Sequence, residues 1–377
     1  YARVGRWHDA VLANLRAIEA DDADLALCRG NTRGVYPLGY VPHNWHFIVA
    51  ASGMEGNAAM TLRAVEAALA ALEGIDGAVV VVDNDSGDGS FERLTAEVAA
   101  QGWDAGPHQV RVLQSGHNGG FGAGNNFGIR AGLPDGARPD YVYILNSDAF
   151  PAPGAIRALV DHLESHPATG FAGSFIHGPD GEPHRTAFRF PSILGEFEQN
   201  IRFGPVSRLL ARHIVAQPLP QATARVDWLA GASMMMRMDV LDRIGLFDET
   251  FFLYFEETDL CRRAARAGWP TDYVVESRVA HIGSVSTGMK TWGRIPQFWL
   301  DSRLHYYVKN HGAAYALAAT LATVAGGALW RARLLIDRKD RGDPPGYLRD
   351  LTVHGLRAMM RPLFPGKKPQ AKTRPIA

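Results

Sequence analysis

The 377-residue sequence predicts an α/β protein in which helices cover both faces of a mainly parallel sheet. In residues 76–312, aliphatic runs of strand length alternate with helical patterns, and several of these runs end in polar turns. The chain is 46% hydrophobic and 21% charged, as folded globular domains are. We therefore expect a three-layer α/β/α sandwich in residues 76–312, with helical hairpins in residues 1–75 and a helical tail in residues 313–377.

The first 75 residues are rich in helix formers, most clearly from residue 58 to residue 72. Residues 4–18 and 40–59 resemble the helical hairpins of tetratricopeptide repeats, in which small residues let paired helices pack closely. A generic helical extension explains the same pattern equally well. Both interpretations predict helices ahead of the sheet.

Two predicted strands end at polar turns. Residues 78–82 are Ala followed by four Val and lead into Asp83, and residues 141–145 lead into Asn146-Ser147-Asp148. Continuous β-branched residues indicate a strand buried on both faces, hence a parallel sheet. The two Asp side chains then lie at the carboxyl edge, where open α/β sheets bind ligands. Each Asp alone is as readily a turn former, but the pair favours a site for a nucleotide and a divalent cation.

A glycine-rich run, residues 119–128, follows a strand predicted at residues 109–113. Its spacing is not G-x-G-x-x-G, so a dinucleotide-binding loop has little support. Close approach of the backbone to a ligand or to a strand explains the glycines as well. The other predicted elements are helices at 91–101, 154–165 and 238–244 and strands at 170–176, 272–275 and 279–283.

The acidic segment FEETD, residues 255–259, opens a helix that Gly268 ends. Three carboxylates near the helix N-terminus complement the dipole, so a capped helix is one interpretation. A catalytic site is the other. His281 ends a later predicted strand, and a single histidine of this kind is more often structural than a metal ligand.

Five motifs occur in one order, and as a series they resemble the family-2 glycosyltransferases of the GT-A fold, particularly rhamnosyltransferase-like and galactofuranosyltransferase-like members. The motifs are VVDNDSGDGS at 81–90, NGGFGAGNN at 118–126, LNSD at 145–148, WLAGA at 228–232 and FEETD at 255–259. The resemblance covers residues 76–312. It implies a GT-A fold, a nucleotide-diphosphate sugar as donor and a divalent cation, Mg²⁺ or Mn²⁺.

The resemblance also implies roles for individual residues. Glu257 would be the catalytic base, paired with Glu256, and His281 would join Asp148 as a metal ligand. The donor-binding residues would be Asp83, Asn118, Gly120, Asn125 and Asp148. We expect like-charge repulsion from Glu256 and Asp259 to raise the pKa of Glu257, and the helix N-terminus to lower it.

Two features depart from the family pattern. The metal motif reads Asn-Ser-Asp at residues 146–148 and so lacks one carboxylate, which makes His281 more important. The first strand of the family, with its Thr-Tyr-Asn-like turn, has no clear match. Residues 46–52 lie at the right distance to replace that strand, although they also fit a repeat helix.

Charge is distributed unevenly along the chain, although its formal net charge is zero. Residues 331–377 carry twelve Lys/Arg and four Asp/Glu, and residues 313–330 carry no charge. An apolar helix beside a basic tail indicates attachment to an anionic membrane surface rather than to nucleic acid. We expect this helix to lie in the membrane interface rather than to span the membrane. The only cysteines are Cys28 and Cys261, and no signal peptide is visible, so we expect a protein at the inner, cytoplasmic face of the membrane.

The sequence thus predicts an inverting glycosyltransferase that acts on a glycan or lipid-linked acceptor in cell-surface polysaccharide synthesis. One alternative is a non-catalytic helical-repeat adaptor whose transferase domain is degenerate and lacks its first strand. A nucleotidyltransferase would share the sheet and the metal Asp, but no glycine-rich, basic triphosphate loop is visible near the start of the sequence. Because the chain opens with Tyr1, a fragment or a fusion is expected.

Overall fold

The computed structural model describes residues 58–282, 293–337 and 344–360, which form two compact units. The first unit comprises residues 58–188, 218–249 and 256–282, and the second the remaining described residues. The predicted repeat hairpins within residues 4–59 lie almost wholly outside the described residues. The same holds for the stretch 46–52, for which the sequence left open a replacement first strand or a repeat helix.

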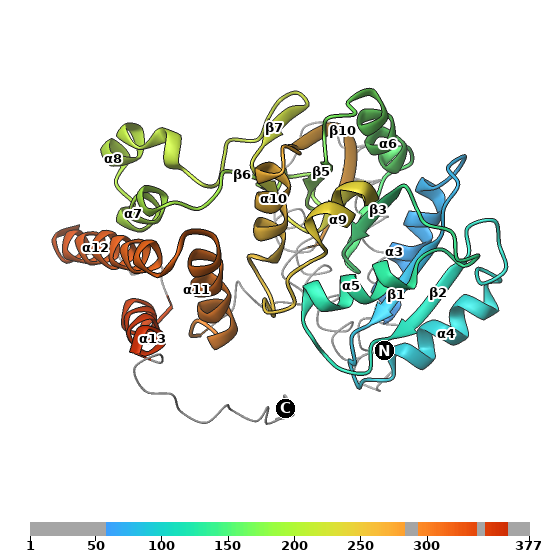
Figure 1. Cartoon of the computed structure of the whole chain (residues 1–377), viewed down its shortest axis with the longest axis horizontal. Coiled ribbons are helices and arrows are strands. Elements are labelled where there is room, and N and C mark those ends of the chain that lie inside the picture. Colours follow the sequence, from blue (N-terminus) through green and yellow to red (C-terminus); the bar gives the residue numbers. More distant parts are fainter. Residues whose placement is uncertain (1–57, 283–292, 338–343, 361–377) are drawn as a thin grey trace, which may run out of the picture. The chain divides into compact units, whose positions relative to one another are not determined.

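The first unit contains a six-stranded sheet of mixed direction (Figure 1). Its strands are hydrogen-bonded in the order β3 (Tyr141–Leu145), β9 (Ser233–Arg237), β5 (Phe171–His177), β10 (Thr271–His281) and β4 (Ala149–Pro151), with β7 (Ala224–Val226) also on β10. β3, β5 and β10 run in one direction, as the expected parallel sheet requires, because β10 pairs parallel with β5 and both β3 and β5 pair antiparallel with β9. The sequence did not predict β9 as a strand. Because β9 is reversed and the short strands β4 and β7 pair antiparallel with β10, most hydrogen-bonded pairs in this sheet are antiparallel.

Two short strand pairs complete the first unit. β1 (Val79–Asp83) pairs parallel with β2 (Val110–Gln114), and β6 (Ala187–Phe188) pairs antiparallel with β8 (Trp228–Leu229). The prediction that the valine run is buried on both faces is wrong, since Val79 to Val82 are only partly buried. β1 and β2 form a two-stranded sheet, so the described residues leave these valines less enclosed than a central strand would be.

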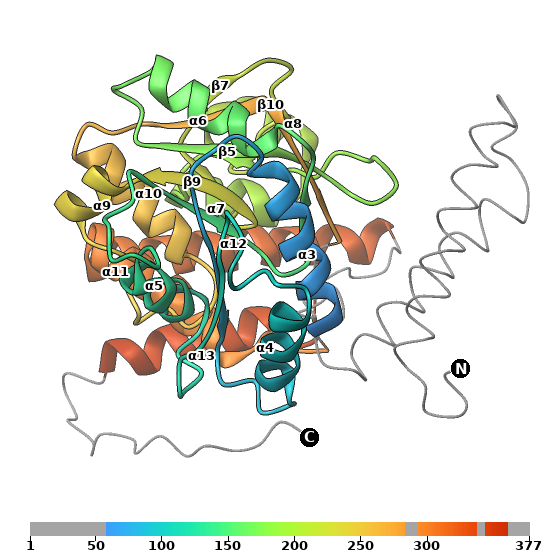
Figure 2. The ribbon, with the colours of Figure 1, turned by 90° about the vertical axis from the view of Figure 1, so that its right-hand side faces the viewer.

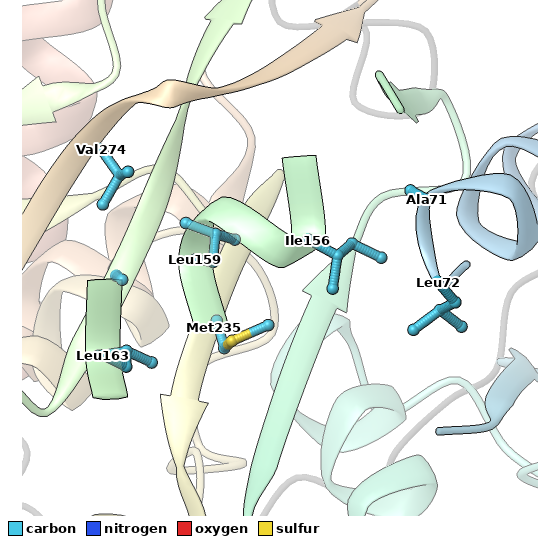
Figure 3. Packing of buried hydrophobic residues seen from close by; sticks show 8 residues of the cluster. Ala71, Leu72, Ile156, Leu159, Leu163, Met235 and Val274 are labelled. Atoms are coloured by element: carbon cyan, nitrogen blue, oxygen red, sulfur yellow. The ribbon is translucent and has the colours of Figure 1, made fainter. Parts of the chain in front are cut away.

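Helices cover both faces of the sheet, as predicted (Figure 2). One layer holds α3 (Ala58–Ala71), α4 (Ser90–Ala100) and α6 (Ala155–Ser165), and the other holds α5 (Phe121–Ala131), α9 (Met238–Ile244) and α10 (Glu256–Arg266). In the first layer, Leu159 and Leu163 of α6 are fully buried against Met235 and Val274 of the sheet (Figure 3). The α/β layered fold expected from the sequence is therefore confirmed.

Strand β10 differs from prediction because the two strands expected at 272–275 and 279–283 are one continuous element. Its parallel register with β5 shifts between Val274 and Arg278, which marks a β-bulge. The bulge contains Ser277, which is fully buried. The local sequence predicts a break between two strands at this bulge. Pairing with β5 on both sides of the bulge instead keeps the segment as one strand.

The second unit is helical. Its elements are α7 (Ile193–Ile201), α8 (Gly204–Leu209), a 3-10 turn (Ala211–His213), α11 (Gln297–His311), α12 (Ala313–Asp337) and α13 (Tyr347–Met360). α12 packs against α7, α11 and α13 (Figure 1). The predicted helical tail is confirmed for the described residues beyond 312.

A buried ion pair ties three helices of the second unit together. Arg303 of α11 lies 3.1 Å from Glu196 of α7 and is 2% exposed. Thr323 of α12 donates a hydrogen bond to Glu196 at 2.6 Å, and Tyr307 donates another at 2.7 Å. Arg303 in turn donates to Thr323 and to Thr320. Burial raises the pKa of Glu196, but the guanidinium and these hydroxyls outweigh that effect and lower the pKa below its usual value. The carboxylate therefore stays charged inside the unit.

Candidate functional site

Asp83 ends strand β1, where the sequence predicted a ligand-binding edge. The residue is 7% exposed, and Gln114 at the end of β2 donates a hydrogen bond to its Oδ2 at 3.2 Å. The two parallel strands end side by side, with Asp83 opposite Gln114 in the register. The carboxylate therefore lies at a carboxyl edge, as expected.

Asn84 links this edge to the glycine-rich motif. Its amide Nδ2 donates to the Gly120 carbonyl at 2.9 Å and to Asn118 Oδ1 at 3.3 Å, and its Oδ1 accepts from Ser115. Asn118 Oδ1 also accepts from the Gly120 backbone N–H at 3.1 Å. Gly120 has a φ of 88°, a conformation that residues with a Cβ rarely adopt. The predicted donor-binding residues Asn118 and Gly120 thus lie together, held by Asn84, which the prediction did not include.

The glycine-rich run forms most of α5, and its glycines permit close packing. A Cβ at Gly122 would lie 3.0 Å from Phe247, and one at Gly128 would lie 3.1 Å from Val82 of β1. Close approach of the backbone is therefore the reason for these glycines. The candidate Asn125 is partly buried and donates its amide to the Phe121 carbonyl within the same helix.

Asn126, one residue further on, is fully buried and fixes the segment that leads toward α10. Its Oδ1 accepts from the Phe247 N–H at 3.0 Å, and its Nδ2 donates to the Phe247 carbonyl at 2.9 Å. The same Nδ2 also lies 2.8 Å from Glu249 Oε1. The Asn126 side chain therefore satisfies both backbone groups of Phe247, as a neighbouring strand would.

We expect Asn126→Ala to lower the free energy of unfolding by about 3 kcal/mol, because it leaves the backbone groups of Phe247 without their bonds. Urea denaturation of the purified protein measures this loss. Asn125→Ala is the matched control: it removes one bond from a partly buried side chain and is expected to cost about 0.5 kcal/mol. Equal losses in the two variants would contradict the role given to Asn126.

The candidate metal ligands Asp148 and His281 meet at the ends of different strands. His281 Nε2 lies 3.0 Å from Asp148 Oδ1, and both residues are largely enclosed. Asp148 precedes β4, which pairs with β10 so that His281 faces Ala149 in the register. Asn146 Nδ2 is 3.4 Å from the same imidazole nitrogen. The sequence expectation that His281 lies close to Asp148 agrees with this geometry.

Within the described residues, no cluster of three or more His, Cys, Asp or Glu could hold a metal ion. Asp148 and His281 supply one carboxylate oxygen and one imidazole nitrogen. Mg²⁺ and Mn²⁺ are commonly held by one or two protein groups together with phosphate oxygens and water. The pair therefore fits a cation that a bound diphosphate helps to coordinate.

Helix α10 begins at Glu256, which is 2% exposed, and continues with Glu257. Glu257 is partly buried as a whole, but its Oε2 has no contact with solvent and no hydrogen-bond donor among the described residues. The backbone amides of Gly231 and of Glu257 itself donate to the carboxylate. The acidic motif is thus joined to the turn after β8, where the sequence placed the WLAGA motif.

Burial raises the pKa of Glu257 to about 7, and the two backbone amide hydrogen bonds oppose that shift. Like-charge repulsion, the cause expected from the sequence, is not what raises it. Asp259 instead forms an ion pair with Arg263 at 2.9 Å, and Arg263 also donates to the carbonyls of Ile244 and Leu246. The third carboxylate of the motif is therefore part of the structural support of α10.

The chain enters α10 through a strained turn. Tyr254 and Phe255 have φ values of 70° and 71°, in the left-handed region that residues with a Cβ seldom occupy. Such strain in non-glycine residues clusters at functional sites. The aromatic segment before the acidic motif therefore ends in a fixed turn that sets where Glu256 and Glu257 begin.

A chain of hydroxyls lies inside the sheet next to the WLAGA turn. Ser233 Oγ is 2.8 Å from the Tyr143 hydroxyl and 2.6 Å from Ser174 Oγ, which is 2.7 Å from Ser277 Oγ. Burial raises the pKa of Tyr143 to about 12, so the phenol stays protonated and can donate. The network joins β3, β9, β5 and the bulge of β10 beneath the turn that contacts Glu257.

Direct contacts connect all five sequence motifs in the first unit. Asn84 bonds Gly120, a Cβ at Gly122 would lie 3.8 Å from Glu256, and the Asn146 N–H donates to the Ala232 carbonyl at 3.1 Å. The sequence prediction did not include Asn84, Asn126 or Ser233 as site residues. Asn126 had a usable signal, because Gly122, Asn126 and Ile129 recur at helical spacing and are all buried.

A family profile described as "Glycosyltransferase like family 2" matches residues 43–297. The N-acetylglucosaminyl-diphospho-decaprenol L-rhamnosyltransferase of Mycobacterium tuberculosis is 32% identical over 226 residues, which cover 56% of this chain and 68% of that protein. The rhamnosyltransferase WbbL of Escherichia coli is 26% identical, with 43% of this chain and 60% of that protein covered.

Among solved structures, the chain is similar to a mannosyltransferase of Pyrobaculum calidifontis in complex with GDP-Man and Mn²⁺. The TM-score is 0.42 at 14% sequence identity, and the match covers 82% of this chain and 85% of the other.

Proposed function

This chain belongs to the glycosyltransferase like family 2, and from that membership we propose that it is an inverting glycosyltransferase. It moves a sugar, rhamnose or a similar one, from a nucleotide-diphosphate sugar to a hydroxyl of a glycan or lipid-linked acceptor in cell-surface polysaccharide synthesis. The layered α/β architecture agrees with the GT-A type that the sequence motifs resemble. The name of the mycobacterial relative, with its diphospho-decaprenol and rhamnosyl groups, supports this choice of donor and acceptor.

The observation that carries the proposal is Glu257 Oε2, a buried carboxylate oxygen without a donor among the described residues, at the junction of the sequence motifs. A general base needs a free lone pair and a pKa near the working pH, and Glu257 has both. In the proposed step, Glu257 takes the proton of the acceptor hydroxyl while that oxygen bonds to the anomeric carbon. The bond from that carbon to the nucleotide diphosphate breaks at the same time.

We assign donor binding to the two motifs that Asn84 joins. Asp83 contacts the nucleotide base, and Asn118, Gly120 and Asn125 contact the rest of the donor. This assignment is supported by the position of Asp83 at the end of β1 and by the hydrogen bonds among Asn84, Asn118 and Gly120. The backbone at Gly120 has no side chain to keep a ligand away.

We further propose that Asp148 and His281 hold a divalent cation, Mg²⁺ or Mn²⁺, together with the donor diphosphate. When bound, the cation supplies positive charge that stabilises the leaving diphosphate. Asn146 holds the imidazole edge of His281, and its own backbone is fixed to Ala232. These contacts keep the two ligands in place before the donor arrives.

The pH dependence of kcat/KM is expected to follow Glu257. The carboxylate must be deprotonated to accept a proton, so kcat/KM should be constant above about pH 7 and fall roughly tenfold per pH unit below it. Initial rates measured across buffers of matched ionic strength give this profile. A profile that stays flat down to about pH 5 would show that the base has the pKa of an ordinary carboxylate and is not Glu257.

The proposed function is tested by release of nucleotide diphosphate from a panel of nucleotide sugars, with and without Mg²⁺ or Mn²⁺. Turnover that requires an acceptor and is abolished by a chelator is expected. The alternative, a non-catalytic adaptor, predicts no release with any donor. A nucleotidyltransferase would instead release pyrophosphate from a nucleoside triphosphate, so a parallel assay with nucleoside triphosphates distinguishes it from the adaptor.

One observation bears on the adaptor alternative, which supposes that the first strand is missing. The family match begins at residue 43, so residues 46–52 fall within it. This supports counting that stretch as part of the transferase domain. With that stretch included, we propose residues 76–312 as the rest of the transferase domain and residues 313–377 as its basic tail.

The lipid-linked acceptor implies where the reaction takes place. We propose that the protein acts at the inner, cytoplasmic face of the cell membrane as a peripheral protein. The support is the net charge of +8 in residues 331–377, which follow the uncharged stretch 313–330. Nucleic acid is not a proposed partner.

A further inference from the structure

The outward face of α12 has a composition that is unusual for a helix in contact with water. Among the residues whose side chains the structure describes, every exposed residue of this helix is Ala or Leu. The three leucines, Leu321, Leu329 and Leu335, are 57%, 54% and 75% exposed. The full set is Ala313, Ala314, Leu321, Ala325, Ala328, Leu329, Ala332 and Leu335. From Ala314 to Leu335 this face is about 32 Å long at the rise of an α-helix.

The inward face of the same helix holds its two buried threonines. Thr320 is 5% exposed and Thr323 is fully buried, and both accept hydrogen bonds from Arg303. Thr323 also donates to Glu196. The polarity of α12 is therefore inverted relative to a helix on the surface of a water-soluble protein, where polar residues face outward.

Within the described residues, α12 is also the one helix long and apolar enough to cross a membrane by length and composition alone. Its packing argues against a crossing. A Cβ at Gly326 would lie 2.7 Å from the Phe197 carbonyl of α7, and one at Gly327 would lie 2.9 Å from Leu348 of α13. Together with the Arg303–Glu196 pair, these contacts hold one side of the helix against its neighbours and leave the other side apolar and open.

Basic side chains occur on α12 and on the neighbouring helix α13. Arg331 and Arg333 lie on either side of Ala332, and the Arg333 guanidinium stacks 5.0 Å from the centre of the Phe203 ring. Arg349 and Arg357 of α13 are exposed, and the sequence after residue 330 has a net charge of +8. Arg331 and Arg333 are on the same helix as this face, so a second copy of the chain packed there would bring like charges together, whereas an anionic lipid surface would neutralise them.

We propose that α12 lies in the plane of an anionic membrane, with its Ala/Leu face in the boundary between headgroups and acyl chains and with the arginines at the lipid phosphates. This arrangement is that of an interfacial helix. The choice of a membrane as the working location rests on the proposed function, but the lipid-binding face is argued from the second unit alone. Removing residues 313–377 would not test this proposal, because the deletion also removes Thr320 and Thr323, which accept hydrogen bonds from Arg303.

The test is sedimentation of the full chain with vesicles of equal parts phosphatidylcholine and phosphatidylglycerol, and with vesicles of phosphatidylcholine alone. We expect strong binding to the anionic vesicles, weakened by salt. Leu321→Glu with Leu329→Glu should lower the partition coefficient at least about tenfold, because both side chains leave the lipid boundary. The matched control places two Glu on exposed alanines of α4, Ala96→Glu with Ala99→Glu, and should stay within about twofold of the unmodified protein.

A gain of binding guards against a variant that fails to fold. Ala325→Leu with Ala332→Leu enlarges the exposed apolar face without touching the packed side, and should raise the partition coefficient about threefold or more. The inference is overturned if the unmodified protein does not bind the anionic vesicles, or if neither α12 variant changes binding. It is also overturned if the protein forms a dimer without lipid that the two Glu substitutions abolish, since the face would then bind a second copy.

The same samples keep this inference separate from the proposed function. The Leu321→Glu, Leu329→Glu variant should release nucleotide diphosphate at the normal rate with a water-soluble acceptor. Vesicle binding without turnover of any nucleotide sugar would contradict the proposed function and leave the lipid-binding face standing. Turnover in solution without vesicle binding would contradict the lipid-binding face and leave the proposed function standing.

Discussion

Glu257→Gln is expected to reduce transfer about a thousandfold while the affinity for the nucleotide sugar stays close to normal. The amide keeps the shape of the side chain but cannot accept the proton of the acceptor hydroxyl. Because Oε2 has no donor within the described part of the chain, the substitution breaks no hydrogen bond at that atom. Single-turnover rates with saturating donor and acceptor, together with calorimetric titration of the donor nucleotide, measure the two quantities separately.

Glu256→Gln is the appropriate comparison, since it removes the neighbouring carboxylate of the same motif. We expect it to lower turnover by about tenfold or less, because this side chain is not assigned the proton transfer. Normal turnover in the Glu257→Gln variant would refute the assignment. A thousandfold loss at Glu256 with a small loss at Glu257 would transfer the role of base to the first residue of α10.

Arg303→Met is expected to destabilise the second unit by about 4 kcal/mol, because Glu196 would remain in the interior without its counter-charge. The pair is deeply enclosed, with side-chain exposures of 2% for Arg303 and 12% for Glu196. Thermal unfolding followed by circular dichroism gives the shift in Tm. Arg294→Met is the matched control, since Arg294 forms an ion pair with Asp350 but is 65% exposed. That loss should be much smaller than the loss in Arg303→Met.

A double variant distinguishes the lost charge from lost packing. Adding Glu196→Gln to Arg303→Met removes the isolated charge, and should restore most of the stability that the single substitution removes. A double variant as unstable as the single one would show that Arg303 acts through its volume, and the ion pair would not be the stabilising element described above.

The layered α/β fold and the positions of the acidic motifs were predictable because they depend on local patterns. Aliphatic runs of strand length and helical spacing are properties of neighbouring residues, and the segments at 141–145 and 256–266 formed as expected. Strand β9 was not predicted, because Ser233 and the three methionines that follow it become a strand only through pairing with β3 and β5. Partners more than fifty residues away in the sequence leave no local signal.

The candidate site was likewise predictable only in part. The motifs pointed to Asp83, Asp148 and Glu257, and the family resemblance added His281, which the structure places beside Asp148. The side chains that hold these groups in position were harder to find. Asn126 bonds a backbone segment about 120 residues further along the chain, at Phe247. The cause of the shifted pKa of Glu257 also could not be foreseen, because burial is a property of the folded chain whereas neighbouring charges are visible in the sequence.

The unpartnered oxygen of Glu257 has a consequence for how substitutions at this position are selected. An unfolded glutamate ionises near 4.5 and the folded one near 7, so the folded state loses stability as pH rises between these values and keeps that deficit above them. A neutral residue at position 257 should therefore make the protein more resistant to heat near neutral pH. A population screened only for thermal survival would accumulate such replacements, whereas one selected for the proposed transfer reaction would lose them.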